Sequence, residues 1–140
     1  HIRAACQASR EKQENRAVKR PEQVIHKAVA DHLRIRAVPG LVWFHVGQSN
    51  YGRNPRGKAI QAAINKGLGV RKGVSDFILL HDSKFFALEI KPKGRSPSEE
   101  QYQFLADVEA AGGFSTWTVG IDRALAVLEA WKLLKGTVHA

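Results

Sequence analysis

Two apolar runs separated by a two-residue polar turn constrain the fold of this chain most strongly. Residues 75–91 read SDFILLHDSKFFALEIK, and the β-branched and aromatic residues on both sides of Asp82-Ser83 favour strands. A tight turn centred on that pair predicts a hairpin in which His81 faces Lys84. A three-residue loop would shift the register by one residue, so every inference from this hairpin requires the two-residue turn.

Charged residues converge at the open end of the predicted hairpin. Following the register outward places Asp76 opposite Glu89, and Lys91 shares their face because side chains alternate along a strand. Two facing carboxylates repel each other by roughly 0.2–1 kcal/mol on an open sheet, and by more when they are desolvated. A divalent cation would relieve this repulsion, and oxygen ligands favour Mg²⁺ or Mn²⁺ over Zn²⁺. The alternative is an ordinary Asp/Lys/Glu cluster where a strand emerges into solvent.

The remaining periodic segments predict a single α/β domain in 140 residues. An amphipathic helix from Pro21 to about Arg34 precedes a buried strand at Leu41–Val46. Ser96, with Pro97 and Glu99, forms the start signal and capping box of a later helix. The other predicted elements are a short helix at 56–66, the hairpin, a strand at 114–119 and a helix at 122–134. The order α-β-α-β-β-α-β-α indicates a small mixed central sheet flanked by helices.

The charge of the chain suits a polyanionic partner. Lys and Arg exceed Asp and Glu by nine, and residues 50–74 contain six basic residues and no acidic one. Basic clusters of this kind bind phosphates with release of counterions, although an idle basic surface is the equal alternative. Residues 1–20 are a basic lead-in, predicted to be flexible or a poorly ordered helix. The single cysteine, Cys6, excludes an internal disulfide and a Cys-based zinc site, and no apolar run approaches membrane-spanning length.

The motifs in order resemble the PD-(D/E)xK nuclease superfamily, and within it the VRR-NUC family (virus-type replication-repair nucleases). The resemblance covers residues 22–134. It is carried by a helix with Glu22 near its start, a strand with Trp43, the loop and strand start GVRKGVSD, the Glu-Ile-Lys strand end and a Ser-Pro helix start with Gln101. Ser75 stands where the family has a proline before the Asp, a change that removes no metal ligand.

This resemblance implies a restriction-endonuclease-like core over residues 21–140, with a metal-dependent active site. The implied metal ligands for Mg²⁺, or Mn²⁺ in its place, are Asp76, Glu89, the carbonyl of Ile90 and Glu22. Lys91 would orient a water or stabilise charge on the phosphate, and Gln101 would position a ligand. The expected DNA-contacting residues are Arg53, Arg56, Lys58, Arg71, Lys72, Lys93 and Arg95.

Other residues that could serve a site have plainer interpretations. His26 follows Glu22 by one helical turn, yet an ordinary histidine of the helix surface is favoured. His45 is likewise expected to be structural. Trp43, Trp117 and Trp131 are expected in the core and not as base-stacking platforms.

The expected function is hydrolysis of phosphodiester bonds in branched DNA, such as four-way (Holliday) junctions, by a Mg²⁺-dependent endonuclease. Symmetric cutting of a junction needs two active sites, so a homodimer is expected, acting on intracellular DNA in a bacterial or viral cytoplasmic setting and not at a membrane. The alternatives are a flap or replication-repair nuclease, a restriction-type nuclease, and a non-catalytic basic DNA-binding module whose carboxylate cluster is structural.

Overall fold

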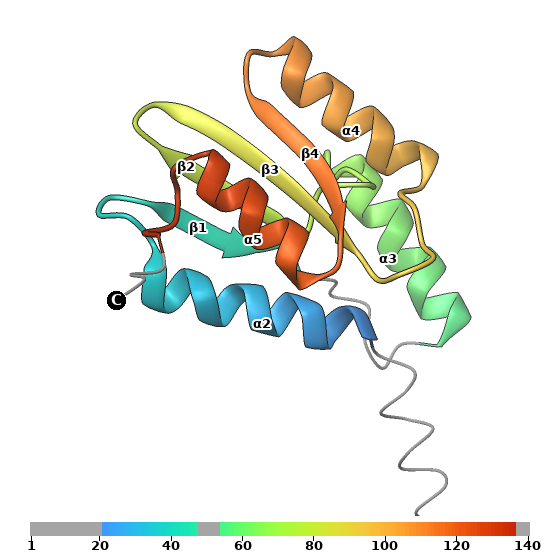
Figure 1. Ribbon diagram of the computed structural model, residues 1–140. Helices are drawn as coiled ribbons and strands as arrows, with labels where there is room; N and C mark the ends of the chain where they lie inside the picture. Colours follow the sequence, from blue (N-terminus) through green and yellow to red (C-terminus); the bar gives the residue numbers. More distant parts are fainter. Residues whose placement is uncertain (1–20, 48–53, 137–140) are drawn as a thin grey trace, which may run out of the picture.

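The computed structural model describes residues 21–47 and 54–136, which form a four-stranded sheet with helices on both faces (Figure 1). The strands are β1 (Val42–His45), β2 (Phe77–His81), β3 (Lys84–Lys91) and β4 (Phe114–Val119), and they lie side by side in that order. β1, β2 and β3 pair antiparallel, whereas β3 and β4 pair parallel. The described helices are α2 (Pro21–Arg36), α3 (Pro55–Gly67), α4 (Glu99–Ala110) and α5 (Ile121–Ala130). The predicted element order and the mixed sheet are confirmed.

The turn between β2 and β3 has the predicted position and length. Asp82 and Ser83 both have positive φ, at 50° and 60°, which is the type I′ geometry whose twist matches the flanking strands. His81 pairs with Lys84, and the last pair of the ladder joins Phe77 to Leu88. One step further along this register, Asp76 comes opposite Glu89. The register on which the predicted charge cluster depends is therefore correct.

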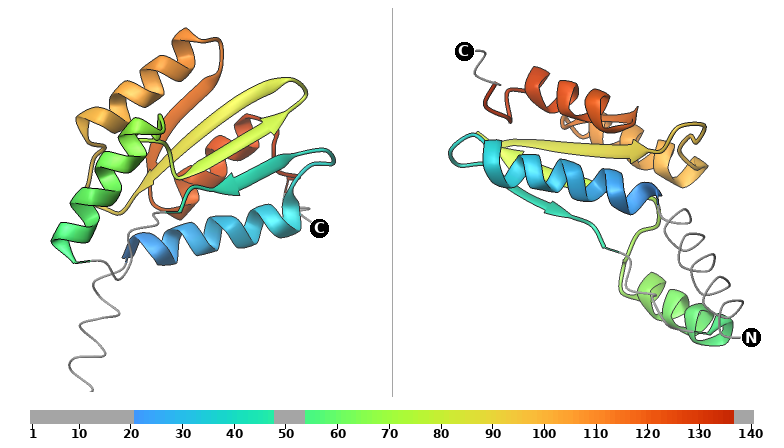
Figure 2. Two further views of the ribbon diagram at one scale, coloured as in Figure 1. Left: turned by 180° about the vertical axis from the view of Figure 1, so that it is seen from behind. Right: turned by 60° about the horizontal axis from the view of Figure 1, so that its bottom comes forward.

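Two apolar cores lie on opposite faces of the sheet, because β3 is buried on both of its sides. Helices α2 and α5 cover one face, and α4 covers the other (Figures 1 and 2). The larger core contains Val29 and Leu33 of α2, Leu128 of α5 and the β-strand residues Phe77, Leu79, Phe86, Leu88 and Ile90. The smaller core contains Ile78, Ala87 and Val108. Burial on both faces fixes β3 in place, and the charged end of β3 with it.

Two of the three tryptophans pack against the core as predicted. Trp43 and Trp131 both contact the larger cluster. Trp117 is half-buried on β4, and its ring meets Tyr102 edge-on with centroids 6.1 Å apart. Trp117 is therefore a partly covered surface aromatic and not a core residue.

Helix α3 lies apart from the layered body of the protein. It has no buried residue, and it projects beyond the sheet in Figure 2. Asn54 caps the helix by accepting a hydrogen bond from the backbone N–H of Gly57 at 2.7 Å, which provides local stability that packing does not supply.

Two predicted helix boundaries are wrong. Helix α4 is capped by Ser98 and not by Ser96, and its capping box uses Gln101 in place of Glu99. The side-chain oxygen of Gln101 accepts a hydrogen bond from the backbone N–H of Ser98, which favours the capping box of Ser98 and Gln101 over that of Ser96 and Glu99. Helix α5 ends at Ala130 and not at residue 134. Its continuation is interrupted at Lys132, whose φ is 62°, so that the next two residues turn into the core and Leu134 bridges to Ala37.

Gly73 places the loop before β2 directly against the start of α4. A Cβ atom at this residue would lie 2.4 Å from the backbone carbonyl of Glu100, and the φ of Gly73 is +83°. We expect Gly73→Ala to lower the free energy of unfolding by about 2–4 kcal/mol, because a backbone clash adds to a left-handed conformation that alone costs roughly 1–2 kcal/mol. Urea unfolding measures the loss.

Gly69 provides the matched control for this substitution. Its φ is +81°, but a Cβ atom there would meet no atom within 4 Å. Gly69→Ala therefore isolates the cost of the left-handed conformation, and equal losses for the two variants would show that the contact with α4 does not matter.

None of the helices in residues 21–47 and 54–136 is long and apolar enough to cross a membrane.

Candidate active site

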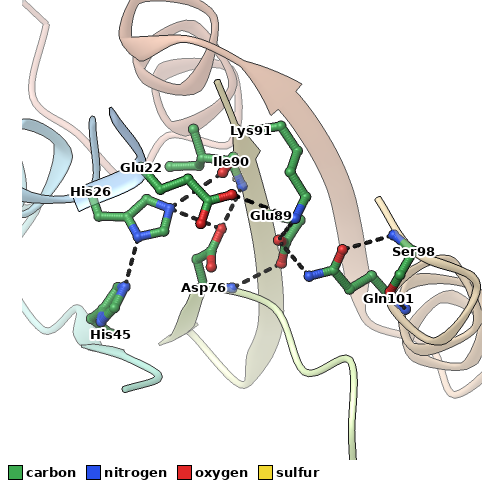
Figure 3. Close-up of polar contacts among 9 residues, drawn as sticks. All are labelled: Glu22, His26, His45, Asp76, Glu89, Ile90, Lys91, Ser98 and Gln101. Atoms are coloured by element: carbon green, nitrogen blue, oxygen red, sulfur yellow. Dashed lines mark hydrogen bonds and ion pairs between the residues drawn. The ribbon is translucent and has the colours of Figure 1, made fainter. Parts of the chain in front are cut away.

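The predicted charge cluster lies where β2 begins and β3 ends, at one end of the two central strands (Figure 3). Asp76 directly precedes β2. Glu89 and Lys91 lie in the last three residues of β3, with their side chains on the same face of the sheet. Helix α4 brings Gln101 to the cluster from one face of the sheet, and α2 brings Glu22 and His26 from the other (Figure 3). All three layers of the fold thus contribute to the site.

The two carboxylates are held in place by backbone N–H groups. The N–H of Asp76 donates to Glu89 Oε2 at 3.2 Å, and the N–H of Ile90 donates to Asp76 Oδ2 at 2.8 Å. The side chain of Glu89 is only 1% exposed, whereas that of Asp76 is 18% exposed. A buried carboxylate beside a second one is costly unless opposite charge is near. The arrangement is therefore suited to a group that brings positive charge.

Lys91 and Gln101 complete the surroundings of Glu89. Lys91 Nζ lies 3.1 Å from Glu89 Oε1, and Gln101 Nε2 donates to the same oxygen at 3.0 Å. The amide of Gln101 is oriented in turn because its Oε1 accepts from the N–H of Ser98 at 2.9 Å. Glu22 stands further off, half-exposed, with its Oε1 4.0 Å from Lys91 Nζ. Asp76, Glu89, Lys91 and Gln101 form a continuous contact network, and Glu22 borders it.

The environment separates the pKa values of the two carboxylates. Burial, and then the nearby charge of Asp76, raises the pKa of Glu89 to about 7, although Lys91 acts to lower it. Burial also acts to raise the pKa of Asp76, but the contact with His26 and the hydrogen bond from Ile90 outweigh it, so the pKa of Asp76 lies below its usual range. Perturbations of this kind are typical of functional sites.

Removing the charge of Glu89 should stabilise the protein at high pH in the absence of divalent metal. A carboxyl group whose pKa is raised in the folded state stabilises the fold below its unfolded pKa, and that stability is lost as the pH rises through the folded value. Glu89 therefore contributes a loss of stability between about pH 4.5 and pH 7 in the wild type, and this contribution is absent in Glu89→Gln. In EDTA at pH 8.5 we expect the variant to be more stable by up to roughly 3 kcal/mol, and at pH 4.5 to be equal.

Urea unfolding at the two pH values measures this difference. Glu109→Gln, which removes an exposed carboxylate of α4, is the matched control. A stability gain for Glu89→Gln that does not depend on pH would contradict the raised pKa.

The interpretation of His26 as an ordinary surface histidine is wrong. Its side chain is only 14% exposed, and its Nε2 lies 3.2 Å from Asp76 Oδ2 and 3.3 Å from the carbonyl oxygen of Ile90. His45 Nε2 in turn lies 3.1 Å from His26 Nδ1. Sequence reasoning placed His26 on the face of Glu22 but missed that α2 crosses the end of β3. The four-residue spacing of Glu22 and His26 indicates that they share a face of α2. It does not indicate that α2 crosses the sheet at the end of β3.

The pKa values of the two histidines are shifted in opposite directions. Burial lowers the pKa of His26, but the hydrogen bond and charge of Asp76 outweigh burial and raise it above the ordinary value. The pKa of His45 is lowered, by burial and then by the charge of His26. The pKa of His26 is therefore above the ordinary value for histidine, and that of His45 is below it.

An open pocket of about 540 Å³ adjoins the histidine side of the site. Glu22, His26, His45 and Asp76 are among its lining residues, together with Arg34. Glu89 and Lys91 lie behind Asp76 and do not line it. A ligand entering from the pocket would therefore meet Asp76 and the histidines first.

The residues predicted to contact DNA lie in different settings. Arg56 and Lys58 belong to α3, and Lys72, Lys93 and Arg95 are exposed in the loops before β2 and after β3. Arg71 is already engaged, because its guanidinium contacts Asp107 at 2.5 Å and lies 5.2 Å from the centroid of Phe104. Arg53 lies outside the described residues.

Comparison of the chain with protein-family models, with curated proteins and with solved structures finds no match.

Proposed function

We propose that this protein is a divalent-metal-dependent endonuclease of the PD-(D/E)xK type, similar to the VRR-NUC family, that hydrolyses phosphodiester bonds in DNA. The observation that carries the proposal is the contact network of Asp76, Glu89 and Lys91 at one end of the hairpin. These three residues also carry the family resemblance. The resemblance relies on their order in the sequence, and the network relies on their distances, so the two arguments are separate.

The donor set fits a hard divalent cation. Asp76 and Glu89 lie side by side, the ammonium of Lys91 contacts Glu89, and burial together with the charge of Asp76 raises the pKa of Glu89 to about 7. Asp76, Glu89 and the carbonyl of Ile90 would hold Mg²⁺, or Mn²⁺ in its place, and Glu22 would reach the ion directly or through water. A bound ion of this kind polarises a phosphate oxygen and lowers the pKa of a bound water.

The chain's own residues supply the remaining chemistry. Lys91 is held beside Glu89 by their 3.1 Å contact, so its ammonium is available to orient the attacking water or to stabilise charge on the phosphate. Gln101 helps to fix Glu89 by donating a 3.0 Å hydrogen bond to the same Oε1 that Lys91 contacts. Because the Oε1 of Gln101 is used by Ser98, its role is to position Glu89 and not to bind substrate.

The basic residues around the site support DNA as the substrate. Lys72, Lys93 and Arg95 are exposed in loops that flank the carboxylates, and α3 carries Arg56 and Lys58. Such side chains position the backbone of a nucleic acid without reading its sequence. We therefore propose selectivity for DNA structure, with four-way junctions as the preferred substrate and a homodimer as the cutting form.

Cleavage of labelled DNA tests this function. The protein is incubated with a four-way junction, a flap and a plain duplex in Mg²⁺, Mn²⁺ or EDTA, and the Asp76→Asn variant prepared in parallel controls for contaminating nucleases. We expect metal-dependent cutting with the junction preferred. Binding of DNA without cutting of any substrate would favour a non-catalytic DNA-binding module.

A further inference from the structure

The proposed reaction leaves two imidazole rings beside Asp76 without a role. His26 comes from α2 and His45 from the end of β1, on the side of Asp76 that faces away from Glu89 (Figure 3). One nitrogen of His26 faces Asp76, and the other faces His45. His45, His26, Asp76 and Glu89 thus form a row. Asp76 belongs both to a nitrogen-containing half, with the two histidines, and to an oxygen-only half, with Glu89.

The nitrogen-containing half brings three potential metal ligands close together. One potential ligand atom from each of His26, His45 and Asp76 can be chosen so that all lie within 4.8 Å of one another. His26 Nε2 lies 3.2 Å from Asp76 Oδ2 and 3.3 Å from the carbonyl oxygen of Ile90, whereas the 3.1 Å contact of His45 is made to the other ring nitrogen of His26, Nδ1. Metal–ligand bonds of about 2.0–2.1 Å in a tetrahedron place the ligands about 3.3–3.4 Å apart. The contacts of His26 Nε2 already have nearly this spacing, and a rotation of the exposed His45 ring would bring its nitrogen to the same ion.

The rings are held in place and are reachable from solvent. Phe77 packs edge-on against both imidazoles, with centroids 6.0 Å from His26 and 5.1 Å from His45. Both rings also line the open pocket of about 540 Å³. An ion bound there would have protein ligands on one side and the pocket on the other, so a coordination position would stay open.

We propose that His26, His45 and Asp76 form a site for a borderline first-row transition ion, with Zn²⁺ as the representative, adjacent to the oxygen-only position at Asp76 and Glu89. Imidazole nitrogen binds Zn²⁺ and Co²⁺ well, whereas Mg²⁺ prefers oxygen ligands. Binding at this site does not depend on the proposed nuclease function. One consequence does: because both positions use Asp76, Zn²⁺ at the histidines should inhibit Mg²⁺-dependent cleavage.

Cobalt provides a spectroscopic probe of the proposed site. The protein is titrated with Co²⁺ at pH 8, because imidazole binds metal in its neutral form, while visible absorption and heat of binding are recorded. We expect one ion with the intense absorption of tetrahedral Co²⁺, which is displaced by Zn²⁺. His45→Gln should weaken binding at least about 10-fold and remove the intense band, as the loss of a ligand predicts.

His45 is the informative position, because its side chain is exposed and its loss should not disturb folding. His81→Gln is the matched control, since His81 lies in β2 near the turn, where its ring contacts the carbonyl of Pro39. Circular dichroism confirms that both variants fold. Equal Co²⁺ affinity and spectra for His45→Gln, His81→Gln and the wild type would overturn the proposal, as would the absence of binding to the wild type.

Glu89→Gln separates this site from the proposed active site. If it keeps the tetrahedral Co²⁺ spectrum, the ion is bound on the histidine side as proposed. If it abolishes Co²⁺ binding while His45→Gln does not, the ion is held by the carboxylates alone and the proposal is wrong. A protein that binds Co²⁺ through His45 but cuts no DNA would contradict the nuclease function and leave this site standing.

Discussion

Asp76→Asn is expected to abolish metal-dependent cleavage, with a loss on the order of 1,000-fold or more in rate. Asp76 is the carboxylate that contacts both halves of the site, through Ile90 on one side and His26 on the other. Its pKa is low, so it is the anion that persists at neutral pH when Glu89 is partly protonated. An asparagine keeps an oxygen that can accept from the N–H of Ile90 but removes the charge that attracts a cation.

Isothermal titration with Mg²⁺ and Mn²⁺ measures the loss of metal binding directly, alongside the cleavage assay. Asp31→Asn is the matched control, because it makes the same chemical change on the exposed face of α2, where Asp31 pairs with Lys27 and Arg34. Unchanged binding of Mg²⁺ or Mn²⁺ by Asp76→Asn would place the metal elsewhere in the protein.

Lys91→Ala is expected to remove cleavage while DNA binding is retained. The side chain of Lys91 is 12% exposed, and its ammonium lies 3.1 Å from Glu89 and 4.0 Å from Glu22, so it cannot contribute much to the electrostatic attraction of DNA from a distance. A loss of about 100- to 1,000-fold in rate is expected when one group that stabilises a developing charge is removed. DNA affinity should change by less than about threefold, since non-specific affinity comes from many phosphate contacts.

The comparison is made at pH 8.5, above the Glu89 pKa of about 7, so that protonation of Glu89 interferes less with metal binding. Lys84→Ala is the matched control at the opposite, exposed end of β3. If Lys91→Ala cut DNA at the wild-type rate, the role given to this lysine would be wrong. If it lost DNA binding as well, Lys91 would be a binding residue.

The hairpin and its charges could be predicted from the sequence because they depend on local rules. The turn at Asp82-Ser83 fixes the register, and the alternation of side chains then brings Asp76 opposite Glu89 without knowledge of any other element. The structure confirms this register. The order of helices and strands is equally local, since each follows from periodicity within a short window.

The histidine half of the site could not be predicted in this way. The contact of His26 with Asp76 depends on where α2 crosses the sheet, and the contact of His45 with His26 depends on β1 pairing with β2. Both are long-range arrangements that no spacing in the sequence encodes. The prediction of the start of α4 was wrong for a related reason. Ser96 and Ser98 are both possible N-caps, and the cap at Ser98 goes together with the long-range contact of Gln101 with Glu89.

The type I′ turn has a consequence for which changes of length the chain can accept. Surface turns ordinarily tolerate insertions and deletions well, and Asp82-Ser83 lies at the far end of the hairpin from the charged residues. Yet one residue added or removed there would exchange the faces of the whole strand, which would separate Asp76 from Glu89 although neither had been touched. Among sequences that share this chemistry, length variation should therefore be confined to other loops, and the hairpin should keep a constant count of residues.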